Sequence, residues 1–148
     1  MKMKKEKQVV IASDHGGFGL KGHLIAHLLK KGYEVLDMGC YCADRCDYPD
    51  YAKKLCRIVL KQKNPGILIC GTGIGMSIVA NKQKGIRAAL CHNTFTAQMA
   101  REHNDANVLC LGGRVLKEKE AKKIVDVFLK TDFSNEARHR GRIKKMEC

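Results

Sequence analysis

The sequence contains no tryptophan and only two prolines, and aromatic residues make up 5% of its 148 residues. It also lacks a long apolar run, since none approaches the roughly 18 residues that a membrane-spanning helix needs. The chain begins with the charged segment MKMKKEKQ, and the apolar run behind it, Val9–Ala12, is too short for a signal-peptide core. Repeats, low-complexity stretches and proline-rich linkers are absent as well. We therefore expect one domain over residues 1–148, in a soluble, cytoplasmic protein with no membrane partner.

Basic residues are in large excess, with 28 Lys and Arg against 15 Asp and Glu and a formal net charge of +13. Such a charge is compatible with nucleic acid as a partner. However, the excess is spread along the chain, and the few aromatic residues offer little for base stacking. Anionic metabolites or simple solubility explain the charge equally well. We therefore expect no nucleic-acid partner.

Cysteine is abundant, with eight residues in the chain. Disulfide frameworks with an even number of cysteines are typical of short secreted proteins. Here Cys70, Cys91 and Cys110 lie in or beside apolar segments that have the character of buried strands. We therefore expect free thiols in a reducing compartment.

One cysteine cluster has the spacing Cys40-x-Cys42-x3-Cys46, which could bind a soft metal with His23 or His27 as a fourth ligand. The cluster lacks the paired C-x-x-C and the second ligand pair that are typical of zinc sites. Loop thiols explain it more simply, so we expect no metal there.

Short apolar segments alternate with segments of helical periodicity. The predicted strands are Val9–Ala12, Tyr33–Leu36, Gly66–Cys70, Arg87–Cys91 and Asn107–Leu111. The predicted helices are Leu20–Leu29, Tyr51–Lys61, Met76–Asn81, Thr94–Glu102, Glu118–Leu129 and a very basic one at Asn135–Glu147. A polar loop, Gly39–Pro49, follows the second strand. Strands that alternate with helices indicate βαβ units, so we expect a doubly wound α/β fold with a five-stranded parallel sheet and an extra C-terminal helix.

Ligands of such folds bind beyond the carboxyl ends of the strands, where the strand order reverses. The residues that follow the predicted strands are Asp14-His15, Cys70–Gly75, Cys91-His92 and Gly113-Arg114. Asp14 can cap the next helix, and His15 can bind an anion or move a proton. Capping alone would also account for this pair.

The segment Cys70–Gly75 places a thiol at the end of a strand and a glycine-rich loop before a helix. Such a loop can direct several backbone N–H groups at one anion, and the helix dipole favours a thiolate. That combination suits covalent attack or proton abstraction next to a carbonyl. It is a poor dinucleotide fingerprint, because Met76 stands where the third glycine should be. A tight turn beside an inert cysteine is the alternative interpretation.

Two further groups of residues have both a chemical and a structural interpretation. His103 follows a helix and can act as an acid or a base, or the turn can be a helix C-cap with Asn104 in the left-handed conformation. Arg138 and Arg142 are spaced i, i+4 on one helix face, which suits a phosphate clamp or a solvated basic surface.

Four segments together carry a family resemblance, and they are Ala12–Gly17, Asp47–Pro49, Cys70–Lys82 and Arg101–Leu109. They resemble the type-B ribose-5-phosphate isomerases, a family that includes galactose-6-phosphate isomerase subunits. The resemblance extends from Val9 to Arg142. It implies a Rossmann-like three-layer α/β/α sandwich, and a homodimer or tetramer with active sites between subunits. It also implies a small sugar phosphate as substrate and no metal or organic cofactor.

The resemblance also assigns roles to residues. Cys70 matches the base that forms the enediolate, and His103 matches the residue that helps to open the furanose ring. The loop that matches the binding groups for the carbonyl and enediolate oxygens consists of Gly71, Thr72, Gly73, Ile74 and Gly75. The residues that match sugar-hydroxyl or ring-oxygen contacts are Asp14, Tyr48 and Asn104. The residues that match the phosphate-binding set are His15, Arg114, Arg138 and Arg142.

The predicted reaction interconverts ribose 5-phosphate and ribulose 5-phosphate, with Cys70 moving a proton between adjacent carbons through an enediolate. Isomerisation of allose 6-phosphate or galactose 6-phosphate is the alternative within the same class. A non-catalytic module that binds nucleotides or nucleic acid is the alternative from a different class.

Overall fold

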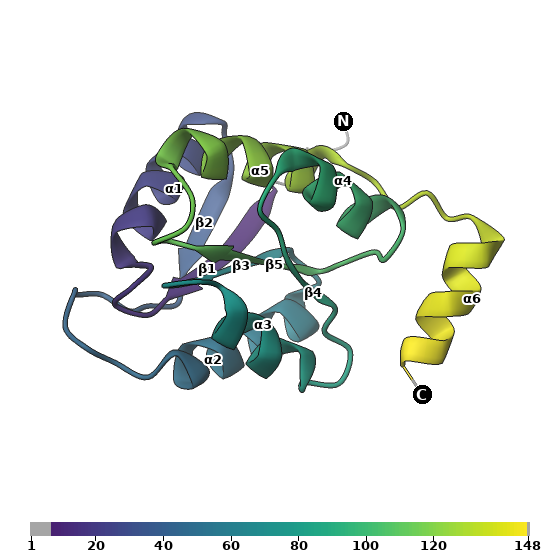
Figure 1. The fold of residues 1–148 in the computed structure, drawn as a ribbon, viewed down its shortest axis with the longest axis horizontal. Helices are drawn as coiled ribbons and strands as arrows, with labels where there is room; N and C mark the ends of the chain where they lie inside the picture. Colours follow the sequence, from purple (N-terminus) through teal and green to yellow (C-terminus); the bar gives the residue numbers. More distant parts are fainter. Residues whose placement is uncertain (1–6, 148) are drawn as a thin grey trace, which may run out of the picture.

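The structure is a computed structural model that describes residues 7–147. Within that range, five parallel strands form one sheet in the order β2-β1-β3-β5-β4 (Figure 1). The strands are β1 (Gln8–Ser13), β2 (Glu34–Asp37), β3 (Gly66–Cys70), β4 (Ala88–Leu90) and β5 (Val108–Gly112). The helices are α1 (Phe18–Lys30), α2 (Tyr48–Gln62), α3 (Ile74–Asn81), α4 (Thr94–Glu102), α5 (Glu118–Lys130) and α6 (Ala137–Met146). The predicted α/β architecture, with its parallel sheet and extra C-terminal helix, is confirmed.

Helices cover both faces of the sheet, because alternate strand side chains point to opposite sides. Val9 and Ile11 of β1 pack with the apolar faces of α1, α4 and α5. Val10 and Ala12 of the same strand pack with α2 and α3 on the other face. The three-layer sandwich is visible edge-on in Figure 1. This two-sided burial explains why the strands read as continuous apolar runs rather than as alternating patterns.

Three helices begin earlier than their periodicity predicts, and the first is α1, which begins at Phe18 rather than Leu20. α2 begins at Tyr48 rather than Tyr51, with Pro49 in its first turn, where a missing N–H costs nothing. α3 begins at Ile74 rather than Met76, directly after Gly73. The polar loop after β2 is therefore shorter than predicted, and Ile74 and Gly75 at the end of the predicted glycine turn belong to α3.

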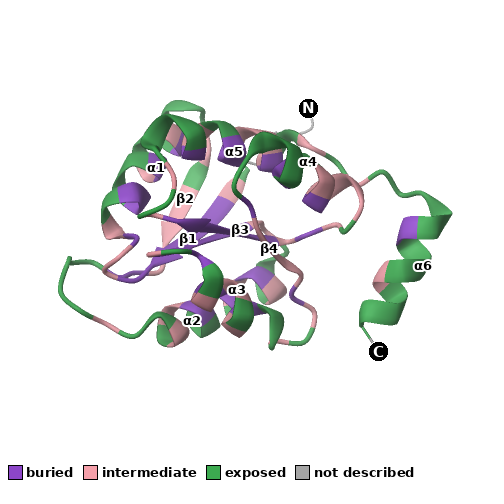
Figure 2. Cartoon of the chain, viewed as in Figure 1, coloured by how far each residue is buried: buried purple, intermediate pink, exposed green. Residues whose placement is uncertain are grey.

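α6 stands beside the sheet rather than on it (Figure 1), and most of its surface is exposed (Figure 2). His139 is its one buried residue. The helix begins at Ala137 rather than Asn135, because Asn135 has a positive φ of 58°. No helix within residues 7–147 combines the length and apolar character needed to cross a membrane.

The strand order reverses between β1 and β3, which lie side by side at the centre of the sheet. β1 leads to its neighbour β2 on one side, and β3 is followed by β4 and β5 on the other. The carboxyl ends of β1, β3 and β5 therefore meet at one edge, the position at which sheets of this type bind ligands.

Candidate active site

Cys70 is the last residue of β3, and its side chain is only 5% exposed. Its Sγ accepts a hydrogen bond from the backbone N–H of Gly73 at 3.1 Å. Gly73 has a φ of 79°, and a Cβ there would lie 2.6 Å from Leu90 Cδ1 and 2.8 Å from the Leu111 carbonyl carbon. Only glycine fits this turn, and the turn directs an N–H donor at the sulfur. A donor in that place stabilises negative charge on the sulfur.

The loops that follow β1 and β5 pack against the loop that follows β3. Gly113 donates its N–H to the Cys70 carbonyl at 2.8 Å, and Arg114 donates its N–H to the Gly71 carbonyl at 2.9 Å. The Arg114 side chain lies over Gly71, since a Cβ there would be 3.0 Å from Nη1. A Cβ at Gly16 would be equally close to the Gly71 nitrogen, at 3.0 Å. Three strand ends thus bring a thiol, a set of backbone amides and a guanidinium together.

Asp14 and His15 follow β1 at the same edge. Asp14 is buried, and its Oδ1 accepts the N–H of Gly17 at 3.1 Å, just before α1 begins. Nδ1 of His15 accepts the N–H of Cys46 at 3.3 Å. Because Nδ1 accepts, a neutral His15 carries its proton on Nε2, which is left as a donor. Asp14 does not cap α1, whose N-cap is Gly17 without a side-chain hydrogen bond, and the anion-binding interpretation of His15 stays a prediction.

Tyr48 and Thr72 complete this edge. A Cβ at Gly75 would lie 2.6 Å from Tyr48 Cζ and 3.0 Å from its hydroxyl, so the phenol rests against the glycine loop. Thr72 is exposed, and its Oγ1 accepts the N–H of Ile74 at 3.3 Å. Tyr48 is the first residue of α2 and Thr72 lies just before the N-cap of α3, and the amino ends of helices favour anionic groups.

The other predicted site residues do not join this group within one chain. Strand register pairs Cys70 with Gly112 at the carboxyl end and Gly66 with Val108 at the amino end. Four residues of strand separate the two ends by about 13 Å. His103 and Asn104 lie in the turn before β5, beyond the amino end, and α6 with Arg138 and Arg142 follows on that side.

His139 is a residue that sequence reasoning missed. Its ring stacks on that of His103, with centroids 4.3 Å apart and an interplanar angle of 14°. It is 4% exposed, and its Nε2 has no hydrogen-bond partner among the described residues. Burial lowers the pKa of His139, and His103 and Arg138 lower it further. The only sequence signal was its place between two arginines, which also suits an exposed helix.

The turn that carries His103 differs from the predicted cap. The left-handed residue is Asp105, with a φ of 44°, and not Asn104. Of the predicted phosphate clamp, Arg138 donates from Nε to Glu136 Oε2 at 2.7 Å, and both side chains are more than half exposed. Arg142 is also exposed on α6. The two arginines therefore lie on one helix, as predicted, and face solvent in the single chain.

Lys21 is a second residue that the sequence did not single out. It is 2% exposed, and its Nζ donates to Asp37 Oδ1 at 2.7 Å and to the Cys40 carbonyl at 2.5 Å. It anchors the start of the loop whose Cys46 holds His15. The sequence held one signal of this burial, since Lys21 is next to Leu20 on the apolar face of α1. Lysine is rarely buried unless it is paired, so a lysine on that face indicates an ion pair.

The cysteine cluster of the 40–46 loop does not assemble into a metal site. His23 pairs with Glu118 at 3.4 Å and His27 with Asp126 at 2.8 Å. Among residues 7–147, no group of three or more His, Cys, Asp or Glu side chains could hold a metal ion. The cysteines in that range are free thiols, as predicted.

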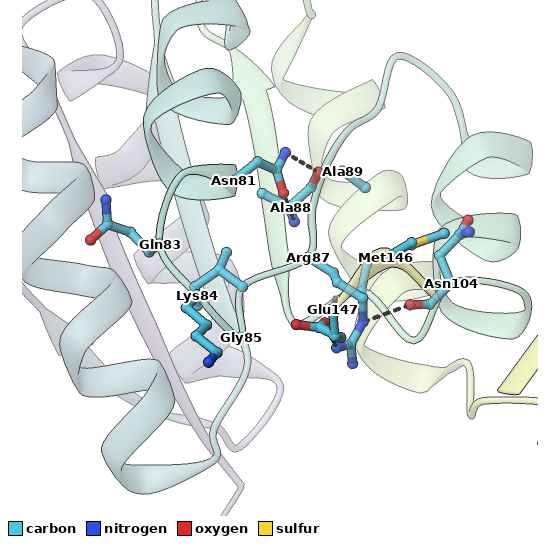
Figure 3. Close-up of a pocket in the computed structure, with 12 residues that line it drawn as sticks. Asn81, Gln83, Lys84, Gly85, Arg87, Ala88, Ala89, Asn104, Met146 and Glu147 are labelled. Carbon is cyan, nitrogen blue, oxygen red and sulfur yellow. Dashed lines mark hydrogen bonds and ion pairs between the residues drawn. The ribbon is translucent and has the colours of Figure 1, made fainter. Parts of the chain in front are cut away.

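Two open cavities lie at the edge opposite Cys70. The first, of about 600 Å³, opens between the start of β4 and the end of α6, where Arg87, Asn104, Met146 and Glu147 line it (Figure 3). The second, of about 740 Å³, lies beneath the amino ends of β1, β3 and β5. The cavity beside α6 is therefore adjacent to the turn that carries His103 and Asn104.

Comparison with known proteins agrees with this architecture. The sequence profile of the family described as ribose/galactose isomerase matches residues 9–146. Ribose-5-phosphate isomerase B of Escherichia coli is 45% identical over 139 residues, which are 93% of each chain. The ribose 5-phosphate isomerase structure from Thermotoga maritima superposes with a TM-score of 0.92 at 50% identity, over 95% of this chain and 97% of that one. The type B enzyme of Trypanosoma brucei also gives 0.92, at 43% identity, over 96% and 97%.

These likenesses first define the class, which is an isomerase with a parallel α/β fold. More narrowly, the chain belongs to the ribose/galactose isomerase family.

Proposed function

We propose that this enzyme interconverts ribose 5-phosphate and ribulose 5-phosphate, with Cys70 as the base of an enediolate mechanism. The observation that carries the proposal is the buried Cys70 thiol, which ends β3 and accepts the N–H of Gly73 at the start of a glycine loop. The relatives named above as ribose-5-phosphate isomerases support the choice of sugar.

In the proposed reaction, the Cys70 thiolate takes the proton from carbon 2 of the open-chain aldose and returns it to carbon 1, while the proton of the carbon-2 hydroxyl passes to the oxygen on carbon 1. One base serves both carbons because they are adjacent. Negative charge develops on the carbonyl oxygen, and the amides of the Gly71–Gly75 loop and the Thr72 hydroxyl are the proposed donors to it. Each such donor typically contributes about 3 kcal/mol in the transition state.

The neighbouring loops supply the proposed contacts to the rest of the substrate. His15 offers its Nε2–H and Arg114 its guanidinium to the phosphate, which lends binding energy and position to the reacting carbons. Asp14 and Tyr48, which border the glycine loop, are the proposed contacts to the sugar hydroxyls. Their closeness to Gly16, Gly17 and Gly75 supports these roles.

The remaining proposed site residues lie at the opposite end of the sheet. They are His103 for ring opening, Asn104 as a sugar contact, and Arg138 and Arg142 as the phosphate clamp. A complete site therefore requires two chains, and we propose a homodimer in which the Cys70 edge of one protomer meets the α6 edge of its partner. The open cavity between β4 and α6 supports this arrangement. Apolar side chains that such an interface would cover are each more than half exposed, and they are Ile74, Ile78, Phe95 and Met146.

Most ribose 5-phosphate is cyclic in water, so an acid–base group must act before the proton transfer. His103 is the proposed group, since a histidine can both accept and donate a proton near neutral pH. Stacking on the buried His139 supports this assignment, because it fixes the plane of the His103 ring. A cytoplasmic location stays a prediction from the sequence.

The experiment that tests the proposal follows ribose 5-phosphate by proton NMR in heavy water with the wild-type protein and the Cys70→Ala variant. We expect ketose with deuterium at the transferred position, and loss of turnover in the variant while substrate still binds. Turnover retained by the variant would move the base elsewhere.

The same experiment separates the alternatives. Turnover of allose 6-phosphate or galactose 6-phosphate, but not of ribose 5-phosphate, would change the substrate. Inactivity on all three, together with salt-sensitive binding to unrelated DNA and RNA, would indicate a non-catalytic module.

A further inference from the structure

The turn between α4 and β5 carries His103 and Asn104 and ends in an unusual residue. At the end of α4, Ala106 donates its N–H to the Ala100 carbonyl at 3.0 Å. Asp105, the residue before it, takes the left-handed conformation with a φ of 44°. Glycine is the usual residue at that position of a helix end, because a side chain is strained there. The strain at Asp105 must therefore be offset by what its carboxylate contacts.

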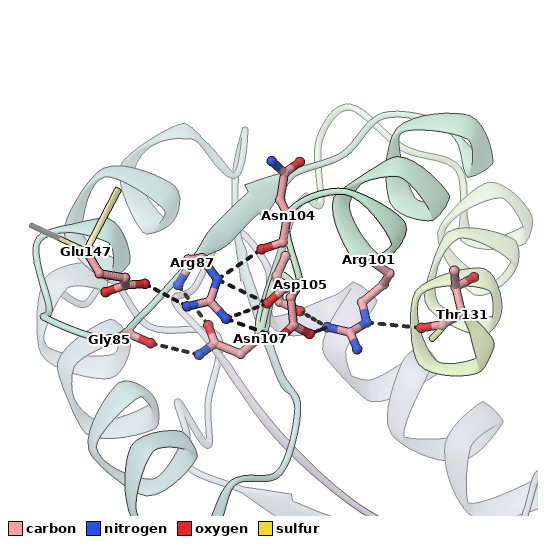
Figure 4. Close-up of polar contacts among 9 residues, drawn as sticks. Gly85, Arg87, Arg101, Asn104, Asp105, Asn107, Thr131 and Glu147 are labelled. Atoms are coloured by element: carbon pink, nitrogen blue, oxygen red, sulfur yellow. Dashed lines mark hydrogen bonds and ion pairs between the residues drawn. The ribbon is translucent and has the colours of Figure 1, made fainter. Parts of the chain in front are cut away.

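The Asp105 carboxylate lies between two arginines (Figure 4). Its Oδ1 accepts from Arg101 Nη1 at 3.0 Å, and its Oδ2 lies 3.4 Å from Arg87 Nη2. Arg101 also donates to the Ala106 carbonyl at 2.5 Å and to the Thr131 carbonyl at 3.1 Å. The carboxylate thus holds both guanidinium groups against the turn.

Arg87 binds the backbone of the turn directly. Its Nε donates to the Asn104 carbonyl at 2.9 Å, and its Nη2 donates to the Asp105 carbonyl at 2.9 Å. The arginine is itself fixed at the start of β4, where its N–H donates to Asn107 Oδ1 at 2.8 Å. A planar guanidinium with several fixed donors can hold two carbonyls in one orientation, which a lysine ammonium cannot reproduce.

The remaining nitrogen of the same guanidinium, Nη1, contacts the end of α6. Arg87 Nη1 pairs with Glu147 Oε1 at 2.6 Å, and both residues line the cavity in Figure 3. The beginning of the same segment is held where Ser134 donates its N–H to the Glu102 carbonyl at 3.1 Å. Between these two ties, His139 lies against His103. One arginine therefore connects the turn that carries His103 with the helix that stacks on it.

We propose that Arg87 is a positioning residue, which holds the His103-Asn104 turn and α6 in the arrangement that ring opening requires. The inference rests on the proposed function, because it assigns Arg87 to one step of that reaction. The two sugars of the reaction differ in whether they need ring opening, so this step can be tested separately. Ribose 5-phosphate closes to a furanose through its 4-hydroxyl, whereas ribulose 5-phosphate cannot close, because its 5-hydroxyl carries the phosphate.

The test compares two reactions in heavy water at saturating substrate. The first is conversion of ribose 5-phosphate, which needs ring opening. The second is exchange of the carbon-1 protons of ribulose 5-phosphate with solvent, which needs only Cys70 and the glycine loop. The variants are Arg87→Lys, which keeps the charge, and Asp105→Gly, which keeps the left-handed turn and removes the carboxylate. Arg57→Lys on the exposed face of α2 is the matched control.

We expect Arg87→Lys and Asp105→Gly to lower kcat for ribose 5-phosphate by about tenfold or more, since small misplacements of a catalytic group have effects of that size. Exchange into ribulose 5-phosphate should change by less than about twofold, and KM for both sugars should rise together, because α6 carries the proposed phosphate clamp. In a His103→Ala background, Arg87→Lys should have no further effect on kcat, because the two act at one step.

Equal losses of kcat in both reactions would mean a merely structural role and would overturn the proposal, as would unchanged kinetics in both variants. A wild-type protein that is inactive on both sugars would overturn the proposed function, and the role of Arg87 with it. The two failures are therefore distinguished by the wild-type measurement. Thermal unfolding of Asp105→Gly checks that the fold is kept.

Discussion

At the scale of single residues, position decides which of the chain's thiols is suited to chemistry. Burial raises the pKa of Cys56 to about 11, and it raises the pKa of Cys110 well above the usual range. Burial also raises the pKa of Cys91. These thiols behave as small apolar side chains. Cys70 ends its strand, and the backbone N–H of Gly73 turns back to donate to its sulfur.

Gly73 is the residue on which that turn depends. We expect Gly73→Ala to destabilise the protein by about 1–3 kcal/mol, because alanine is strained at a positive φ and its Cβ meets Leu90 and Leu111. Activity should fall as well, because the N–H donor at Cys70 moves. Urea unfolding and the NMR assay would measure the two effects.

Gly19→Ala is the matched control for that substitution. Gly19 lies in α1 with no neighbour within 4 Å of its missing Cβ, so alanine should add about 0.5–1 kcal/mol of stability. Equal behaviour of the two alanine variants would contradict the role given to the left-handed turn.

At the scale of elements, hydrophobic periodicity predicts well the strands and helices that pack in the core on the two faces of the sheet. Gly66–Cys70 and Thr94–Glu102 are observed with the predicted bounds, because clear breakers or caps flank them. The predicted start of α2 was wrong, because the apolar pattern begins one turn inside the helix, after Pro49. A pattern of buried residues reports the packed face and leaves out an exposed first turn.

Contacts between distant elements lie beyond such patterns. Arg87 and Glu147 are 60 positions apart, and nothing in either local segment indicates the pairing. The burial of His139 follows from the path of residues 131–136, which places α6 beside the His103 turn. The glycine loop was recognisable because its residues are adjacent in sequence. The turn that carries His103 and α6 are far apart in the sequence, and only the folded chain brings them together.

α6 should make the protein sensitive to mild acid. Burial lowers the pKa of His139 below its unfolded value, so the unfolded chain binds the proton more readily. Stability should therefore fall as the pH drops below about 6.5, and the loss should continue until the folded pKa is passed.

Urea unfolding at about pH 7.5 and about pH 5.5 measures this effect, because the two values bracket an ordinary histidine pKa. His139→Phe keeps a stacked ring without the titration, so its stability should depend less on pH than that of the wild type. His92→Phe, at an exposed position, is the control. A wild-type dependence shared by His139→Phe would assign the acid effect to other groups.

At the scale of the whole molecule, the sheet separates the proposed machinery into two edges. Cys70 and its loop lie at the carboxyl end, and His103 with α6 lies at the amino end, about 13 Å of strand away. A two-fold symmetric dimer brings each edge against the opposite edge of its partner, because such an interface repeats every contact twice. Two equivalent sites then form from two incomplete chains.

Subunit mixing tests this division between chains. Cys70→Ala and His103→Ala should each be impaired alone, and co-refolding them in equal amounts should restore about 25% of wild-type activity. Half of the dimers are then mixed, and each mixed dimer has one site with neither substitution. Co-refolding Cys70→Ala with Cys70→Ser is the control and should restore nothing, because both changes lie at the same edge. If mass spectrometry detects mixed dimers of Cys70→Ala and His103→Ala but activity does not return, each site is built within one chain. In that case the turn at His103 must serve another purpose.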